Sequence, residues 1–310
     1  MRNHQKIARI LPCHREGLPT IIINSEIPEP EGGYAVKESP VVKFLYGTVV
    51  GRGLLKIIMV LHLDRAAVAF LCSPVSKIII PRYIRKNQIP MDEFCPGPYR
   101  SFREFFLREK KERTVDPVPD HLVSPCDGWL SACPVGENRQ FFLKGSCYRI
   151  SDLIRDRGVA EGFSGGLCLV FRLCASDYHH YCFIDDGIQK STQFIEGQLH
   201  SVQPIACETF PVFSLNRRVW SLLETRHFGP VVQTEIGALV VGGIVNRNPE
   251  GPFRRGQEKG RFELSGSTVV LFFEQNRVTL EPEIREALEQ NPEVRVELGQ
   301  WIGERSRDHE

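Results

Sequence analysis

The pattern of apolar residues changes near residue 120, and this change limits the folds open to the chain. Residues 41–90 hold apolar runs of helical character, interleaved with basic side chains and a single acid, Asp64. Residues 99–108 predict a further helix with an aromatic face. From residue 122 onward, short apolar and polar alternations such as 167–173 and 294–298 predict strands. The eight basic residues of the first segment are Lys43, Arg52, Lys56, Arg65, Lys77, Arg82, Arg85 and Lys86.

This pattern predicts an α+β fold with three parts. Residues 1–40, rich in proline and glycine, are expected to form an extended arm with a short strand at 20–23. Residues 41–119 are expected to form a helical, basic segment, and residues 120–310 are expected to form a β-rich core. Regular βα alternation and a G-x-G-x-x-G turn after a strand are both missing, so a Rossmann fold is excluded.

Composition narrows the function classes further. A formal net charge of +1 argues against nucleic-acid binding by bulk charge. The ten cysteines contain no C-x-x-C pair, which argues against a zinc or redox centre and indicates a reducing compartment without disulfides. The N-terminus has no apolar stretch of signal-peptide length, so secretion is not expected.

The helical segment raises the question of a membrane. Residues 54–71 are almost long enough to span a bilayer. Asp64 and Arg65, near the middle, would each cost about 2.5–3.5 kcal/mol there, so a spanning helix is not expected. Two interpretations remain: helices packed on the protein's own core, or helices lying on an anionic membrane surface.

A Gly266-Ser267-Thr268 triplet leads directly into the apolar run 269–273. Glycine reaches backbone angles closed to other residues, which leaves the Gly266 carbonyl open to attack by the Ser267 hydroxyl. Attack would convert the peptide bond to an ester, and elimination would leave an N-terminal pyruvoyl group at position 267. Taken alone, such a triplet is typical of a turn entering a strand.

Three other clusters accompany the triplet. They are the turn Ser124-Pro125-Cys126-Asp127-Gly128, the segment Ser176-Asp177-Tyr178-His179-His180-Tyr181-Cys182, and Gly256-Gln257-Glu258-Lys259-Gly260. Each has an ordinary explanation by itself, since an aspartate can cap its own turn and a histidine at a strand end is commonly a hydrogen-bonded surface residue.

Together these clusters resemble the phosphatidylserine decarboxylase family, the pyruvoyl-dependent enzymes of phospholipid synthesis. The family's hallmarks are a Ser-Pro-x-Asp-Gly turn, an Asp-Tyr-His-Arg-x-His segment and a Gly-Ser-Thr cleavage site. The resemblance covers about residues 41–305. It includes Lys43-Phe44-Leu45-Tyr46-Gly47, Lys144-Gly145 with Tyr148, Ser201-Val202-Gln203-Pro204, and Gly237-Ala238 with Val241-Gly242.

The resemblance implies a processing set of Asp127, His179 and Ser267, with cleavage between Gly266 and Ser267. The carboxylate would orient the imidazole, which would take the hydroxyl proton. The pyruvoyl group formed from Ser267 would be the covalent cofactor and the electron sink for loss of CO2. His179 would return the proton that completes phosphatidylethanolamine. A metal or a free cofactor is not called for.

The resemblance also implies the chain's partners. They are phosphatidylserine in a bilayer, an anionic membrane surface, and the chain's own two fragments, which would stay together after cleavage. The basic apolar segment would then dock the protein as a peripheral membrane protein on the cytoplasmic side. The oligomeric state stays open, a homodimer included.

One departure from the family pattern concerns the histidines. The family has Arg and a second His where this chain has His180 and Cys182. His179 is therefore predicted to be the processing base, with His180, Cys182 and Thr268 as second-rank candidates. Cys182 would need a strongly lowered pKa to act as a thiolate base. Two other hypotheses remain: a decarboxylase of a soluble amino acid, and a membrane-surface relative that is not processed.

Overall fold

The computed structural model describes residues 40–306, apart from residues 62, 144–145, 175, 239–242, 248–249 and 265–266. These described residues belong to one compact unit, Glu38–Glu310. The predicted strand at 20–23 and the predicted arm up to residue 39 lie outside them, as does Gly266.

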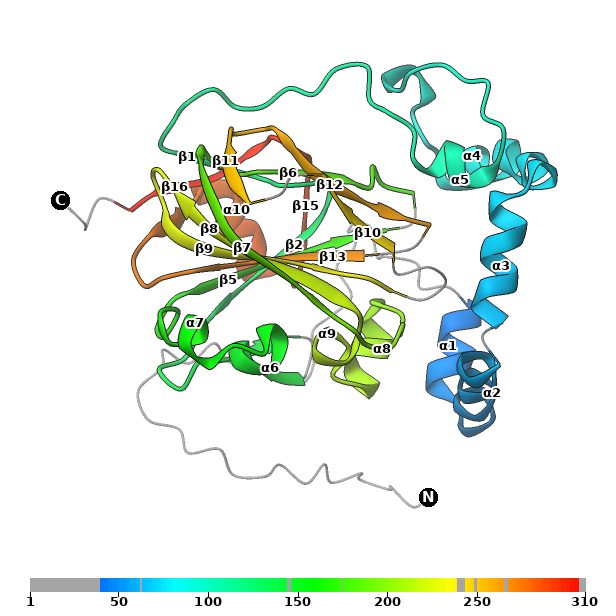
Figure 1. Ribbon diagram of the computed structural model, residues 1–310, viewed down its shortest axis with the longest axis horizontal. Helices are drawn as coiled ribbons and strands as arrows, with labels where there is room; N and C mark the ends of the chain where they lie inside the picture. The colour runs from blue at the N-terminus through cyan, green and yellow to red at the C-terminus, as the bar shows by residue number, and fades with distance from the viewer. Residues whose placement is uncertain are drawn as a thin grey trace. The chain divides into compact units, whose positions relative to one another are not determined.

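The centre of the fold is an eight-stranded antiparallel sheet with the order β11-β7-β8-β9-β13-β5-β2-β15 (Figure 1). Its strands are β11 (Gly251–Phe253), β7 (Gly187–Ile195), β8 (Arg218–Thr225), β9 (Gly229–Ile236), β13 (Ser267–Phe273), β5 (Leu167–Leu173), β2 (Gly128–Pro134) and β15 (Val294–Val296). The predicted strands at 167–173 and 294–298 are thereby confirmed, the second over its first three residues.

The central strand β13 is buried on both faces, which explains its unbroken apolar sequence. Val270 and Phe272 face one core cluster, whereas Val269, Leu271 and Phe273 face another. Successive side chains of a strand point to opposite faces, so a strand covered on both sides is apolar throughout. Ser267, the first residue of β13, pairs with Leu173 of β5.

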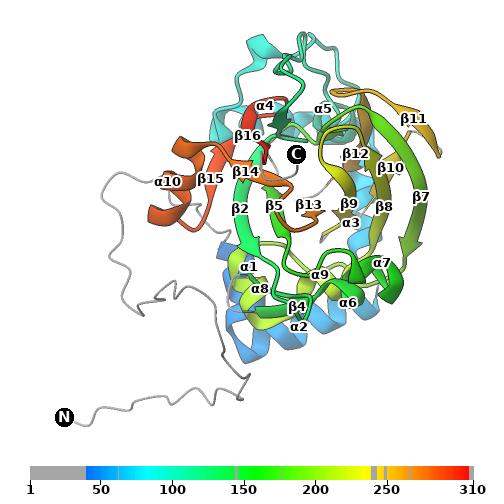
Figure 2. The same cartoon turned by 90° about the vertical axis from the view of Figure 1, so that its left-hand side faces the viewer.

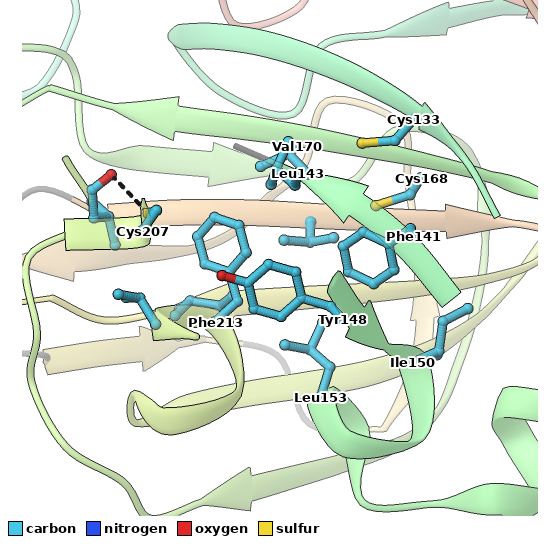
Figure 3. Close-up of a cluster of buried hydrophobic side chains, with 14 of the residues drawn as sticks. Cys133, Phe141, Leu143, Tyr148, Ile150, Leu153, Cys168, Val170, Cys207 and Phe213 are labelled. Carbon is cyan, nitrogen blue, oxygen red and sulfur yellow. Dashed lines mark hydrogen bonds between the residues drawn. The ribbon is translucent and has the colours of Figure 1, made fainter. Parts of the chain in front are cut away.

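Short helices and a hairpin cover the first face of the sheet. They are α6 (Ile150–Ile154), α7 (Arg157–Glu161), α8 (Pro204–Thr209), α9 (Val212–Leu215) and the hairpin β3–β4 (Gln140–Leu143, Ser146–Arg149). Figure 3 shows Phe141, Tyr148 and Phe213 gathered in the core cluster beneath them.

Two three-stranded sheets and a helix cover the other face. One sheet has the order β10-β12-β6 (Gly243–Asn246, Glu258–Glu263, His180–Cys182), and the other has the order β1-β16-β14 (His121–Val123, Trp301–Arg305, Val278–Leu280). The helix is α10 (Pro282–Gln290). Through β6 and β12, residues 180–182 and 258–263 of the predicted motifs lie side by side.

The predicted helical segment precedes these sheets. It consists of α1 (Pro40–Gly47), α2 (Val49–Val60), α3 (Leu63–Cys72), the 3-10 turn η1 (Pro74–Ile79), α4 (Ile80–Asn87), η2 (Met91–Glu93) and α5 (Phe102–Phe106). Residues 54–71 are thus divided between α2 and α3. No single described helix is long and apolar enough to cross a bilayer. The helices 65–72 and 74–87 are long and apolar enough only when taken together, and they are bent by 77° relative to each other.

The short helix α5 ties the helical segment to the core. Ser101 caps it by accepting the Glu104 N–H, and the Phe102 N–H donates to Ser76 Oγ in η1. Phe102, Phe105 and Phe106 then pack in a third core cluster. This cluster also contains Tyr178 and Cys182, which belong to the predicted segment 177–182, and Leu264, which precedes the Gly266-Ser267-Thr268 triplet.

Candidate active site

Ser267 and His179 are in contact although they are 88 residues apart in sequence. His179 Nδ1 lies 3.2 Å from Ser267 Oγ. Both side chains are fully buried. Pairing of β13 with β5 positions Ser267, while the Phe262 N–H of β12 donates to the His179 carbonyl and positions the histidine.

The second ring nitrogen determines which tautomer His179 adopts. His179 Nε2 lies 2.9 Å from the backbone carbonyl of Cys174. Because a carbonyl can only accept, Nε2 carries the proton and Nδ1 presents its lone pair to the Ser267 hydroxyl. The backbone of Cys174 therefore sets up His179 as a proton acceptor for Ser267.

A tight turn holds the Cys174 carbonyl in place. The Asp177 N–H donates to that same carbonyl, and the Asp177 carboxylate accepts the Cys174 N–H. Arg295 pairs with Asp177 at 3.0 Å. Burial raises the pKa of Asp177, and the positive charge of Arg295 opposes that rise. Buried Arg108 donates to the Ser176 and Asp177 carbonyls and so braces the turn from the α5 side.

An aromatic side chain covers the imidazole. Phe106 of α5 stacks on His179 with ring centroids 4.3 Å apart and planes inclined by 30°. This contact keeps water from one face of the ring and limits its rotation.

Asp127 is buried, and its carboxylate partners differ from those expected. It accepts hydrogen bonds from Lys110 Nζ, at 3.1 Å to Oδ1, and from the Leu298 N–H at 2.8 Å. Lys110 also lies 2.9 Å from Oδ2. A charge-relay set would have a direct hydrogen bond between Asp127 and His179, and the described residues do not form one. The Cys174 carbonyl accepts from His179 Nε2 instead.

His180 points away from Ser267 into an ion-pair network. Its Nδ1 lies 3.2 Å from Glu258 Oε1, and its ring stacks on Tyr178. Burial raises the pKa of Glu258, but His180, Arg247 and Arg113 outweigh burial and leave it below the ordinary value.

Glu109, His180 and Glu258 bring three potential metal-ligand atoms within 4.8 Å of one another. Glu258 is already paired with Arg113 and Arg247, and Glu109 accepts the Tyr178 hydroxyl. Two guanidinium groups on the shared carboxylate leave little negative charge for a cation, so the donor set fits an ion-pair network better than a metal site.

The remaining second-rank candidates are buried beside these groups. Burial raises the pKa of Cys182 to about 12, so its thiol is neutral at physiological pH and is not a thiolate base. Thr268 Oγ1 is buried without a hydrogen-bond partner among the described residues.

Sequence reasoning missed Phe106, Arg108, Lys110 and the Cys174 carbonyl. The three side chains follow one another closely at the end of the aromatic helix, but neither composition nor spacing connects them with residues 127 or 179. A backbone carbonyl leaves no signal in a sequence at all.

Ser267 also fits the position that a pyruvoyl group would require. It begins β13, whose next residues pair with β5 on one side and β9 on the other. Cleavage before Ser267 would thus leave the new terminus held in the sheet beside His179. A buried hydroxyl facing an imidazole acceptor is the arrangement of a serine nucleophile with its base.

Comparison with known proteins identifies the family. The family model described as phosphatidylserine decarboxylase matches residues 101–304. Phosphatidylserine decarboxylase proenzyme 2 of Clostridium acetobutylicum is 38% identical over 85% of this chain and 91% of that protein. The proenzymes of Desulfitobacterium hafniense (strain Y51) and Clostridium kluyveri are 34% and 35% identical, over 86% and 84% of this chain and 92% and 91% of their own. The chain belongs to the phosphatidylserine decarboxylase family.

Proposed function

We propose that this chain is a proenzyme that cleaves itself between Gly266 and Ser267 and then converts phosphatidylserine to phosphatidylethanolamine and CO2. Family membership supplies the reaction. The observation that carries the assignment to these residues is the 3.2 Å contact between His179 Nδ1 and Ser267 Oγ.

In processing, His179 accepts the hydroxyl proton as Ser267 Oγ attacks the Gly266 carbonyl. The Cys174 carbonyl stabilises the resulting imidazolium, because it accepts from Nε2 in both protonation states. Phe106 keeps the ring in place during the transfer.

Elimination from the ester would break the chain and leave a dehydroalanine at position 267, which hydrolysis with loss of ammonia would convert to a pyruvoyl group. That group would supply the carbonyl that accepts the electrons released with CO2. His179 is a titratable side chain in contact with Ser267, so we assign it the return of the proton to the α-carbon. The buried surroundings exclude water that would compete for that step.

Asp127 is proposed to assist processing through its charge. Burial is the main cause that raises the pKa of Asp177 and Cys182, and the negative charge of Asp127 adds to it. Both residues belong to the same segment as His179, so we infer that this charge also acts on His179. A negative charge there favours the imidazolium, while Lys110 offsets part of the effect.

The two fragments are proposed to remain one folded protein. Strand β13 belongs to the C-terminal fragment, but both of its sheet neighbours, β5 and β9, belong to the N-terminal fragment. Strands β15 and β16 likewise pair with β2 and β1 across the cut. Separation would expose both core clusters.

The helical segment is proposed to dock on an anionic membrane as a peripheral anchor, on the cytoplasmic side. One side of α1 packs on the core through Val42, Leu45 and Tyr46. Most exposed large apolar side chains of the described residues lie along the same segment, among the basic residues. They are Val41, Phe44, Val49, Val50, Leu54, Ile57, Leu61, Phe70, Val75 and Ile78.

The intact mass of the purified protein under denaturing conditions tests the proposal, together with product formation. We expect two polypeptides, the second starting at position 267, and phosphatidylethanolamine from phosphatidylserine vesicles. Cleavage with activity on free serine alone would favour the soluble amino acid. A single uncleaved chain would favour the unprocessed relative.

A further inference from the structure

A strongly basic pocket lies on the first face of the fold, away from Ser267. It has a volume of about 770 Å³ and lies between the hairpin β3–β4 and the helices α6 and α7. Its lining includes four arginines but only two acids, Asp152 and Glu161. The arginines are Arg139, Arg149, Arg155 and Arg157.

The side chains that line the pocket carry four positive charges and two negative ones, so the pocket has an excess of two positive charges. None of the four arginines forms an ion pair with a carboxylate in the part of the chain that the structure describes. A fifth, Arg218, is fully buried beneath the pocket and donates to the backbone carbonyls of Asp152, Leu153 and Asn216. Burial, and then the charge of Arg155, lower its pKa to about 10, so Arg218 is still cationic at neutral pH.

Two of the arginines occupy backbone conformations that favour glycine. Arg139 has φ of 60° and Arg155 has φ of 55°. Arg155 is the C-cap of α6, where this conformation commonly ends a helix, and a glycine at either position would avoid the steric cost of a side chain. Glycine would occupy both positions more easily, yet the chain places a guanidinium group at each.

The hairpin beside the pocket also presents an apolar side chain to solvent. Phe141 and Tyr148 stack on its inner side and anchor it in the core cluster (Figure 3). Phe142 is 63% exposed. Because Phe142 pairs with Cys147 and Gln140 pairs with Arg149, Phe142 and Arg149 lie on the same outer face.

The pocket lies at the same end of the fold as the first membrane-docking helices. Helix α6 contacts α9, α9 contacts α8, and α8 contacts α1. Figures 1 and 2 both place α6, α8 and α9 at this end, level with α1 and α2. A bilayer contacted by α1 and α2 would therefore also be within reach of this end.

We propose that the pocket binds the phosphate group of an anionic phospholipid other than the substrate, and so forms a second contact with the bilayer. Guanidinium groups bind phosphate through paired, charge-assisted hydrogen bonds. The exposed Phe142 suits the acyl boundary just beyond the headgroups, and this combination favours a lipid over a soluble phosphate.

Flotation of the full-length protein with phosphatidylcholine vesicles, with and without phosphatidylglycerol, tests this proposal. Phosphatidylglycerol has no amine and cannot react as the substrate does, so active-site turnover does not enter the measurement. The test variant is Arg139→Gly with Arg155→Gly, which removes two charges while suiting the left-handed backbone. At about 1 kcal/mol per basic residue, partition to the anionic vesicles should fall roughly 10- to 30-fold.

The matched control is Arg285→Gln with Arg305→Gln. It removes the same charge from two exposed positions on α10 and β16, which Figure 2 shows away from α6 and α7. This control should bind within about twofold of the wild type. Phe142→Ser should weaken binding to the anionic vesicles without changing the melting temperature, because the side chain is mostly exposed.

Equal flotation of the pocket variant and the control would overturn the proposal. A second result would also overturn it: calorimetry shows that inorganic phosphate binds the wild type but not the pocket variant, while both bind vesicles equally. That result would assign the pocket to a soluble phosphate. Loss of anionic-vesicle binding in the pocket variant alone supports the lipid assignment.

Discussion

Phe106 stacks on the imidazole of His179, with ring centroids 4.3 Å apart. Phe106 belongs to α5, at the end of the helical segment, whereas His179 belongs to the β-rich part of the chain. The helical segment proposed to dock on a membrane therefore ends in a helix whose last residue, Phe106, covers the proposed base. The domain boundary predicted at residues 119 and 120 stays a prediction, and side chains from both sides of it contribute to this site.

Replacement of the nucleophile should abolish maturation. Ser267→Ala should remain a single, inactive chain, because no hydroxyl is left to attack the Gly266 carbonyl. Thr268→Val is the matched control, since the buried Thr268 Oγ1 has no partner among the described residues to lose. It should mature at the wild-type rate. Denaturing electrophoresis reports both results, and cleavage of Ser267→Ala at the same bond would exclude the proposed chemistry.

The two adjacent histidines should behave differently. His179→Ala should block cleavage, because His179 is the proton acceptor at Ser267 Oγ. His180→Ala should still mature with only a modest loss of stability, because Glu258 keeps Arg113 and Arg247 as ion-pair partners. Time courses of the two-band pattern, with melting curves for both variants, test this difference. Normal maturation of His179→Ala with an intact His180→Ala would show that His180 is the base.

Cys182 should not contribute to processing through a thiolate. Burial raises the pKa of Cys182 from the ordinary 9.0 to about 12. Below that pH, the fraction of Cys182 present as thiolate is small and rises tenfold with each pH unit. A Cys182 base would make the cleavage rate climb in the same way from pH 7 to pH 10. We expect no such climb, and we expect Cys182→Ala to mature within about threefold of the wild type. A blocked Cys182→Ala variant that keeps its fold by circular dichroism would contradict this.

The predicted effect of Asp127 is electrostatic. Asp127→Asn keeps an acceptor for the Leu298 N–H but removes the negative charge that acts on Asp177 and Cys182, in the same segment as His179. Cleavage should slow by about tenfold to a hundredfold, with little change in fold. Lys110→Met is the converse control, and it should not slow cleavage, because it removes the charge that offsets Asp127. Wild-type kinetics for Asp127→Asn would reduce Asp127 to a structural turn residue.

The exposed apolar side chains of α2 should contribute to membrane binding. Leu54→Ser with Ile57→Ser should weaken binding to vesicles containing anionic lipid by at least tenfold. Val118→Ser with Ile188→Ser replaces apolar side chains of similar exposure outside the helices and should leave binding unchanged. Binding of the wild type should also weaken with added salt, which screens the basic residues. If both double variants bind the vesicles equally well, the result would favour the other interpretation, in which these helices only pack on the protein's own core.

The sequence by itself determined the family and the main strands, and it predicted the reacting bond. Unbroken apolar runs such as 269–273 predict strands buried on both faces, because such residues have no solvent-facing side to satisfy. The order of the short motifs was sufficient to indicate the reaction. These signals are local, since each depends on residues close together in the chain.

Only the tertiary structure decided which groups meet at Ser267. Strand pairing turns His179 toward Ser267 and His180 toward Glu258, and it brings Phe106 onto the imidazole. It also gives Nε2 a backbone carbonyl and gives Asp127 a lysine, in place of the direct carboxylate–imidazole bond that the motifs predict. The physical reason is that these contacts join residues far apart in the chain. Their geometry follows from how β6, β12 and β13 pair and from where α5 packs, and no local pattern encodes either.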